Sequence, residues 1–226
     1  MNRWEMVESV SLPDGTGVMD LLRRGKELAI NVNGRQLMST RMHGSEDALA
    51  ELACKHIGDR PQARVLIGGL GMGYTLAAAL RNLGPDASVT VAELVPAVVR
   101  WNQGEIGSAA AYPLRDPRAS VYTGDVAEQV SDPERAWDAI MLDVDNGPDA
   151  LTHAGNGWLY GWHGLSTAYQ ALTPGGMLAV WSAWPDKSFT QRLAKVGFEV
   201  KENPVRARGS KGGRRHVVWT AVRGGA

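Results

Sequence analysis

The hydrophobic pattern of the first 43 residues predicts short β-strands. Three extended runs are expected, at residues 18–22, 28–32 and 36–39. Asn33-Gly34 separates the last two runs, and such a pair favours a two-residue hairpin turn because both of its residues take positive φ. We therefore predict two or three antiparallel strands before the first helix.

A helical period follows and predicts a helix over residues 46–57. Ser45 is the expected N-cap, and acidic Glu46 and Asp47 in the first turn suit the positive end of a helix dipole. The apolar residues of this segment share one face, as in a helix with a buried stripe.

Strands and helices alternate from residue 63 onward. Apolar runs predict strands at residues 64–67, 88–92, 120–123, 137–142 and 177–181. Helical patterns lie between them, the clearest at residues 95–103, 159–172 and 187–195, with a predicted loop at residues 173–176. This order is typical of an α/β fold with a parallel sheet and helices on both faces. The last two runs, 198–201 and 216–222, have no helix between them, so we expect them to pair antiparallel.

Composition narrows the class of protein. The chain has 226 residues, with 24 Lys+Arg and 24 Asp+Glu, so its net charge is zero and it has no long-range attraction for nucleic acid or an anionic membrane. No stretch has the ~20 apolar residues of a membrane span, and the N-terminus lacks a signal-peptide layout. The only cysteine, Cys54, fits a reducing cytoplasm. The histidines have no metal-ligand spacing, so we predict no metal.

A glycine-rich turn follows the first buried strand. Gly69, Gly71 and Gly73 alternate there, which lets a ligand approach the backbone at the start of the next helix. A dinucleotide fingerprint would have a third glycine at Tyr74, and no Gly-Lys-Ser/Thr follows as in a phosphate-binding loop. The spacing favours a nucleoside sulfonium ligand of the S-adenosylmethionine type, and the alternative is a structural turn.

Carboxylates follow the next strands. Glu93 ends one strand and is a candidate for the ribose hydroxyls, although an exposed strand-end acid is the alternative. Asp125 can accept a hydrogen bond from the adenine amine, with Val126 on the ring face, or can serve as a helix N-cap. Asp143, Asp145 and an amide follow the most apolar strand, where a carboxylate can take the proton of an attacking amine. A plain turn is the alternative there.

Two further features have open interpretations. The loop at residues 206–215 carries arginines among glycines and fits either an anionic or nucleic-acid substrate or a solvated hairpin. Tyr160 lies between Trp158 and Trp162, and these aromatic residues fit either the wall of a substrate pocket or the core.

Five segments in this order resemble the spermidine synthase (polyamine aminopropyltransferase) family, at residues 27–39, 43–46, 65–73, 92–96 and 142–145. The resemblance implies an N-terminal β-hairpin region, residues 1–43, and a Rossmann-like domain of the class I S-adenosylmethionine-dependent methyltransferase fold, residues 44–226. Where the family's glycine loop usually has an aspartate, this chain has Gly71. The family's second acid after the strand falls on Asn146.

The resemblance also implies roles for individual residues. Asp143 matches the family's catalytic aspartate. Substrate contacts are expected from Ser45, Glu46, Asp145, Asn146 and Tyr160. The nucleoside ligand is expected at Gly69, Leu70, Gly71, Gly73, Glu93, Leu94, Asp125 and Val126.

We therefore expect a transferase that alkylates a small-molecule amine with S-adenosylmethionine or its decarboxylated form. Aminopropyl transfer is the first hypothesis, and methyl transfer to a small molecule is the second. A non-catalytic nucleoside-binding or scaffold protein is the third. The exposed hairpin edge is the expected surface of a homodimer.

Overall fold

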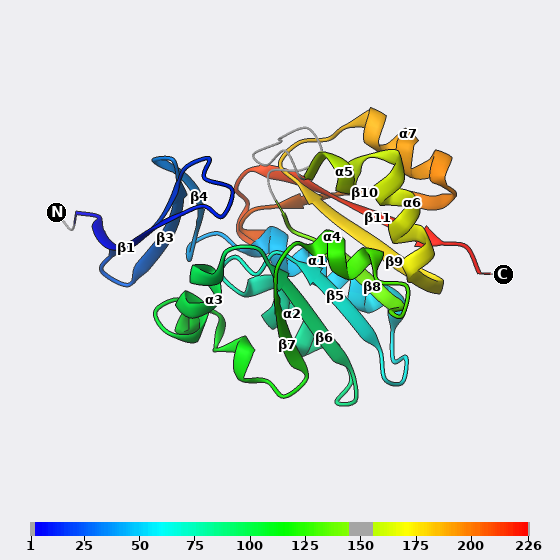
Figure 1. Ribbon diagram of the computed structural model, residues 1–226, viewed down its shortest axis with the longest axis horizontal. Coiled ribbons are helices and arrows are strands. Elements are labelled where there is room, and N and C mark those ends of the chain that lie inside the picture. The colour runs from blue at the N-terminus through cyan, green and yellow to red at the C-terminus, as the bar shows by residue number, and fades with distance from the viewer. Residues whose placement is uncertain (1–2, 145–155, 226) are drawn as a thin grey trace.

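The computed structural model describes residues 3–144 and 156–225, which form two β-sheets flanked by helices (Figure 1). The smaller sheet is antiparallel, with the strand order β1-β2-β3-β4. Its strands are β1 (Glu5–Ser11), β2 (Val18–Arg24), β3 (Glu27–Val32) and β4 (Arg35–Ser39). The sequence missed β1, since none of its residues is buried and it has no apolar face to detect. Asn33 and Gly34 have φ of 50° and 75°, which confirms the predicted hairpin turn.

The larger sheet has the order β10-β11-β9-β8-β5-β6-β7. Its strands are β5 (Arg64–Gly68), β6 (Ser88–Glu93), β7 (Ala119–Thr123), β8 (Trp137–Leu142), β9 (Leu172–Ser182), β10 (Phe198–Arg206) and β11 (Arg215–Arg223). Strands β5 to β9 are parallel, and β11 lies antiparallel between β9 and β10. The predicted fold class is therefore confirmed: an α/β, Rossmann-like methyltransferase fold with a separate small antiparallel sheet at the N-terminus.

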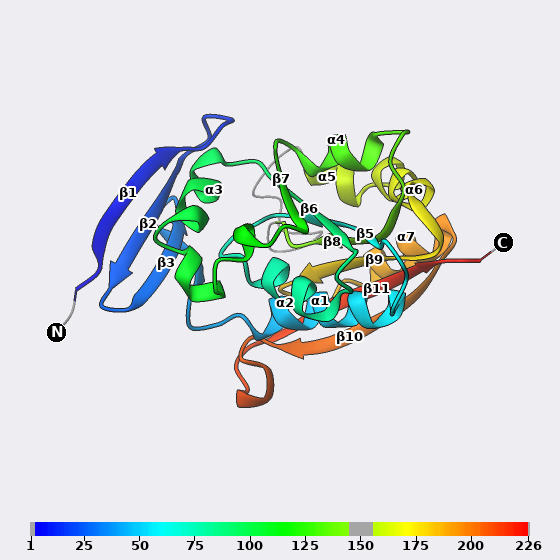
Figure 2. The ribbon, with the colours of Figure 1, turned by 90° about the horizontal axis from the view of Figure 1, so that it is seen from below.

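Helices cover both faces of the larger sheet (Figure 2). One face packs against α1 (Gly44–Ile57), α2 (Tyr74–Asn82) and α3 (Pro96–Gln103), and the other against α4 (Val126–Ser131), α5 (Asn156–Tyr160), α6 (Trp162–Ala171) and α7 (Lys187–Val196). Short 3-10 helices are η1 (Gly107–Ala110), η2 (Pro113–Arg115) and η3 (Gly209–Lys211). Successive residues of β5 alternate between two cores: Val65 and Ile67 belong to the first, and Leu66 belongs to the second.

Two local predictions are wrong. Ser45 is not an N-cap, because α1 begins at Gly44 with His43 as its N-cap. The main-chain N–H of Gly44 donates to the carbonyl of Ala207 at 2.9 Å, so the end of another hairpin satisfies it. The predicted loop at residues 173–176 is part of β9, which Arg60 and Asp138 hold through hydrogen bonds to Thr173.

The small sheet lies beside α3 (Figure 1). The carboxylate of Glu8 accepts hydrogen bonds from Arg100 at 2.7 Å and from the indole N–H of Trp101 at 2.6 Å. Buried residues of the sheet, such as Leu21 and Ile30, belong to the same core as α1 and α2. Shared packing of this kind does not test the predicted domain boundary between residues 43 and 44, which stays a prediction.

Candidate active site

The site is at the carboxyl end of the larger sheet, where the order of strands changes direction. Strand β5 lies between β6, which follows it in the chain, and β8, which comes later. In open α/β sheets ligands bind beside such a switch point. The glycine turn after β5 and Asp143 after β8 therefore meet here, as the sequence predicts.

Glycine is required at position 69 of this turn. Gly69 has φ of +90°, and a Cβ on it would lie 2.5 Å from the main-chain oxygen of Asp143. Gly71 and Gly73 also have positive φ, of 51° and 79°. The turn is thus pressed against the end of β8 and leads directly into α2.

Glu93 lies under the glycine turn and fixes its shape. Its carboxylate accepts hydrogen bonds from the main-chain N–H of Leu70 at 2.9 Å and of Val95 at 2.8 Å. The residue is buried, and burial raises the pKa of Glu93 above its usual value although these N–H groups lower it. The alternative of an exposed strand-end acid is excluded. Binding of ribose stays a prediction, and Leu94 beside Glu93 is exposed.

Asp125 is the N-cap of α4, since its carboxylate accepts from the N–H of Ala127 at 2.9 Å. The N-cap interpretation is therefore confirmed, and contact with an adenine amine stays a prediction. Val126 is buried, and its side chain lies 3.0 Å from where a Cβ on Gly68 would be. Both residues follow β7, at the same edge of the sheet as the glycine turn.

A side chain of α2 forms a hydrogen bond with the carboxylate of Asp143. Its Oδ2 accepts a hydrogen bond from the hydroxyl of Thr75 at 2.8 Å. Burial of the carboxyl raises the pKa of Asp143 to about 6, against the lowering effect of that hydrogen bond. A carboxylate with a raised pKa holds a proton more tightly and is therefore a stronger base than an ordinary aspartate.

Glu46 adds a second acid from the first turn of α1. The hydroxyl group of Ser45 donates a hydrogen bond to Oε2 of Glu46 at 2.6 Å. Burial, and then the negative charge of Asp143, raise the pKa of Glu46 to about 7. Two carboxyl groups with raised proton affinity therefore share one environment, and we call Glu46 and Asp143 the acid pair.

Sequence reasoning missed three residues that shape this site. Thr75 holds Asp143, and the amide of Asn102 donates to the carbonyl of Gly71 at 2.8 Å. Met38 of β4 covers the turn, with its sulfur 3.1 Å from where a Cβ on Gly71 would be. Asn102 is fully buried in α3, next to the buried Trp101. A polar residue on the apolar face of the predicted helix was therefore the sequence signal that could have identified it.

Of the remaining predicted residues, the structure describes Tyr160 but not Asp145 or Asn146. Tyr160 is buried, donates to the carbonyl of Val144 at 3.0 Å and packs edge-on against Phe189, so its ring belongs to the core. A contact of Tyr160 with substrate stays a prediction. Asp145 and Asn146 lie outside the described residues.

The described residues contain neither a cluster of metal ligands nor a membrane-spanning helix. No group of three or more His, Cys, Asp or Glu side chains there could hold a metal ion. No helix among those residues is long and apolar enough to span a bilayer.

A surface groove of about 570 Å³ lies between α1 and β10, but none of the predicted site residues lines it. The site is therefore defined by strand ends rather than by this groove.

Comparison with known proteins agrees with this geometry at the level of the fold. No protein-family model and no curated protein sequence matches the chain. Two crystal structures of spermidine synthase are similar to it, one from Thermotoga maritima and one in complex with the transition-state analogue AdoDATO. Each matches with a TM-score of 0.76 and 17% identity, over 97% of this chain and 72% of the other. The chain therefore has a spermidine synthase-like fold.

Proposed function

We propose that the protein is a transferase that moves an aminopropyl group from decarboxylated S-adenosylmethionine to a small-molecule amine. The observation that carries the proposal is the acid pair beside the glycine turn. Two half-buried carboxyl groups at a ligand-binding edge attract cationic centres, and both the sulfonium donor and the amine acceptor provide one. The spermidine synthase-like fold supports the same reaction class.

The nucleoside part of the donor fits the strand ends. Carboxylate oxygens each have two lone pairs, so Glu93 can accept from ribose hydroxyls in addition to the main-chain N–H groups it binds. Asp125 follows the neighbouring strand and is the candidate for the adenine amine, with Val126 against the ring. The glycine turn lets the sulfur approach the main chain without obstruction by a Cβ.

The chemistry of transfer is a substitution at carbon. When bound, the donor supplies an electrophilic carbon next to its positively charged sulfur. The lone pair of the acceptor nitrogen forms a C–N bond as the C–S bond breaks. The electron pair of the C–S bond stays on sulfur, which leaves as part of neutral methylthioadenosine. Asp143 takes the proton that the nitrogen loses. Thr75 orients that carboxylate, and Glu46 holds the acceptor's ammonium group before it is deprotonated.

One observation favours methyl transfer as a second candidate. The aminopropyl donor ends in an ammonium group, and at position 71 this chain has a glycine rather than a carboxylate to bind it. S-adenosylmethionine carries a carboxylate beside that ammonium group, so it depends less on an acid in the turn. In this case the methyl carbon forms the C–N bond, and S-adenosylhomocysteine leaves.

The test is a transfer assay with both donors and a panel of amines, with products identified by mass spectrometry. We expect an aminopropylated product that requires the decarboxylated donor and is lost in Asp143→Asn. A methylated product would replace the first proposal by the second. Binding of methylthioadenosine without turnover of any amine would instead indicate a nucleoside-binding protein. A homodimer and a cytoplasmic location stay predictions.

A further inference from the structure

The hairpin that joins β10 to β11 carries an unusual concentration of positive charge. We call residues 206–215 the basic hairpin, and its exposed arginines are Arg206, Arg208, Arg214 and Arg215. None of these four forms an ion pair with a carboxylate within residues 3–144 and 156–225. Arg206 and Arg215 are directly opposite each other in the β10–β11 ladder. Like charges in such a pair repel and destabilise the hairpin, so an anion that binds both would relieve the repulsion.

The basic hairpin is a defined structure attached to α1. The N–H of Ala207 donates to the carbonyl of Arg214 at 3.0 Å, and the N–H of Arg208 donates to that of Gly212 at 2.9 Å. Gly44 at the start of α1 donates to Ala207, and a Cβ on Gly44 would lie 2.2 Å from the nitrogen of Gly209. Figure 2 shows the hairpin projecting beside α1. Its position is therefore fixed relative to Glu46, two residues further along the helix.

Two side chains beside the hairpin have buried polar atoms that lack a partner among the residues the structure describes. His216 follows Arg215 directly, and its ring lies 4.9 Å from the ring of Trp181 at the end of β9. Nδ1 of His216 and the indole N–H of Trp181 have no hydrogen-bond partner among the described residues. Buried orphan groups of this kind are rare in native proteins and often mark a missing water, ion or ligand. His216 and Trp181 share the face of the sheet that packs against α1, whereas Arg206 and Arg215 lie on the other face by the alternation along β10 and β11. The orphan atoms therefore do not belong to the Arg206–Arg215 pair.

We propose that the basic hairpin binds the anionic end of the acceptor, so that the acceptor is an amine that also carries a carboxylate or phosphate group. The amine end lies at the acid pair, and the anionic end lies at the hairpin arginines. This inference rests on the proposed function, because it assumes that an amine binds at Glu46 and Asp143. It also implies that a second ammonium group, as in a diamine, is repelled at the same place.

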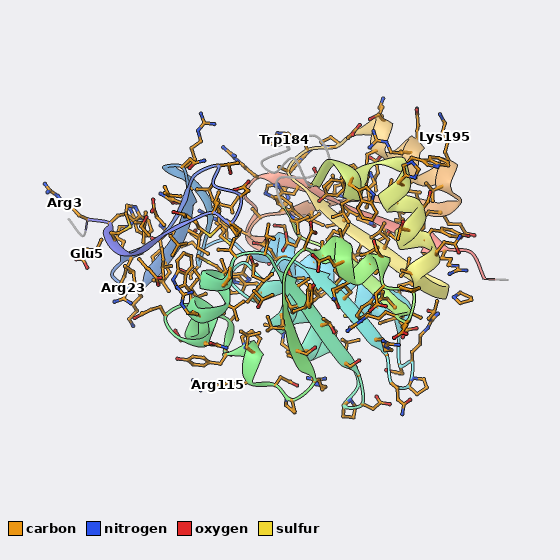
Figure 3. The ribbon with its side chains drawn as sticks, viewed as in Figure 1. Arg3, Glu5, Arg23, Arg115, Trp184 and Lys195 are labelled. Atoms are coloured by element: carbon orange, nitrogen blue, oxygen red, sulfur yellow. The ribbon has the colours of Figure 1, made fainter. Side chains whose placement is uncertain are left out.

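The experiment compares two acceptors of the same length, 4-aminobutanoate and 1,4-diaminobutane. We expect wild-type kcat/KM to favour the aminobutanoate by roughly tenfold, because its distal carboxylate meets the arginines. The double variant Arg206→Gln/Arg215→Gln should lose most of that preference. The control Arg3→Gln/Lys195→Gln removes two exposed cations at opposite ends of the molecule and should keep it (Figure 3).

A binding measurement separates this inference from the proposed function. Calorimetric titration of 4-aminobutanoate into the complex with methylthioadenosine needs no turnover, so it remains informative if no acceptor reacts. Salt-sensitive binding that the hairpin variant weakens supports the inference. Preference for the diamine, an unchanged ratio in the hairpin variant, or hairpin-dependent binding of a short oligonucleotide with no aminobutanoate binding would each overturn it.

Discussion

The acid pair and the basic hairpin both approach the first turn of α1, Glu46 as part of that turn and the hairpin through its contact with Gly44, yet their charges have opposite signs. Glu46 and Asp143 are half-buried and their pKa values are raised, whereas the hairpin arginines are exposed. Gly44 connects the two regions, since it binds the hairpin two residues before Glu46. A charge shielded from water interacts strongly with a bound ligand, whereas an exposed charge interacts more weakly and is screened by salt. The acid pair is thus suited to chemistry, and the hairpin to choosing the acceptor.

Removal of the proposed base should produce the largest effect. Asp143→Asn keeps the hydrogen bond from Thr75 but cannot accept the acceptor's proton, so transfer should fall about 10²- to 10⁴-fold. The binding of methylthioadenosine, measured by calorimetry, should stay within a few-fold of wild type.

Asp138→Asn is the matched control on the same strand. Burial alone would raise the pKa of Asp138, but hydrogen bonds from Arg64, Arg60 and Thr173 outweigh it and lower the pKa. Asp138 is at the other end of β8, so this variant should lose stability while its rate of transfer at saturation is unchanged. Equal rates for Asp143→Asn and wild type would remove Asp143 from the mechanism.

The pH dependence of stability should differ between the two regions. Glu46 in the folded protein has a pKa of about 7 against an ordinary 4.5, so the folded state binds this proton more tightly than the unfolded state. Its contribution is present below about pH 4.5 and is lost as the pH rises through about 7, on the order of 3 kcal/mol. Urea unfolding should show that Glu46→Gln flattens this decline. Arg206→Gln/Arg215→Gln should not, because arginine stays charged over the whole range.

The contact between the two regions can be broken at Gly44. In Gly44→Ala the new Cβ meets the backbone of Gly209, which cannot move as a flexible side chain can. Although alanine favours a helix, we expect a loss of about 1–3 kcal/mol in the free energy of unfolding and faster trypsin cleavage within the hairpin. Gly224→Ala, at a glycine with open space around it, is the control and should be neutral. An equally stable Gly44→Ala with an unchanged cleavage rate would show that the hairpin is not fixed there.

The smallest effect is expected from a single hairpin arginine. Arg206→Gln removes the repulsion across the ladder from Arg215 and should stabilise the protein by about 0.2–1 kcal/mol at low salt. Thermal unfolding at low and high salt measures it, and the gain should shrink as salt screens the charges. Destabilisation at low salt would mean that Arg206 has a favourable partner.

Much of the fold could be predicted because its signals are local. The buried strands β5 and β8 are mostly apolar runs, and Asn33-Gly34 determines its own turn. Features that depend on distant partners could not be predicted. The N–H of Gly44, the first residue of α1, is bonded by Ala207, far along the chain, and β1 is recognisable as a strand only through its pairing with β2.

The candidate site also combines features that local sequence signals predict and features that depend on distant partners. Acids after parallel strands converge by the geometry of the sheet, so Glu93, Asp125 and Asp143 could be placed together from the sequence. That Glu93 binds the glycine turn itself, and that Asn102 holds Gly71, depends on side-chain packing that the sequence pattern does not record.

The most direct test of the central claim is to measure the affinity for a sulfonium donor and for its neutral product as a function of pH. If the acid pair binds the positive sulfur, decarboxylated S-adenosylmethionine should bind roughly tenfold more weakly at about pH 5 than at about pH 8, because both carboxyl groups become protonated. Neutral methylthioadenosine should bind equally at both values. The same pH dependence for both compounds, or no binding of either, would contradict the account.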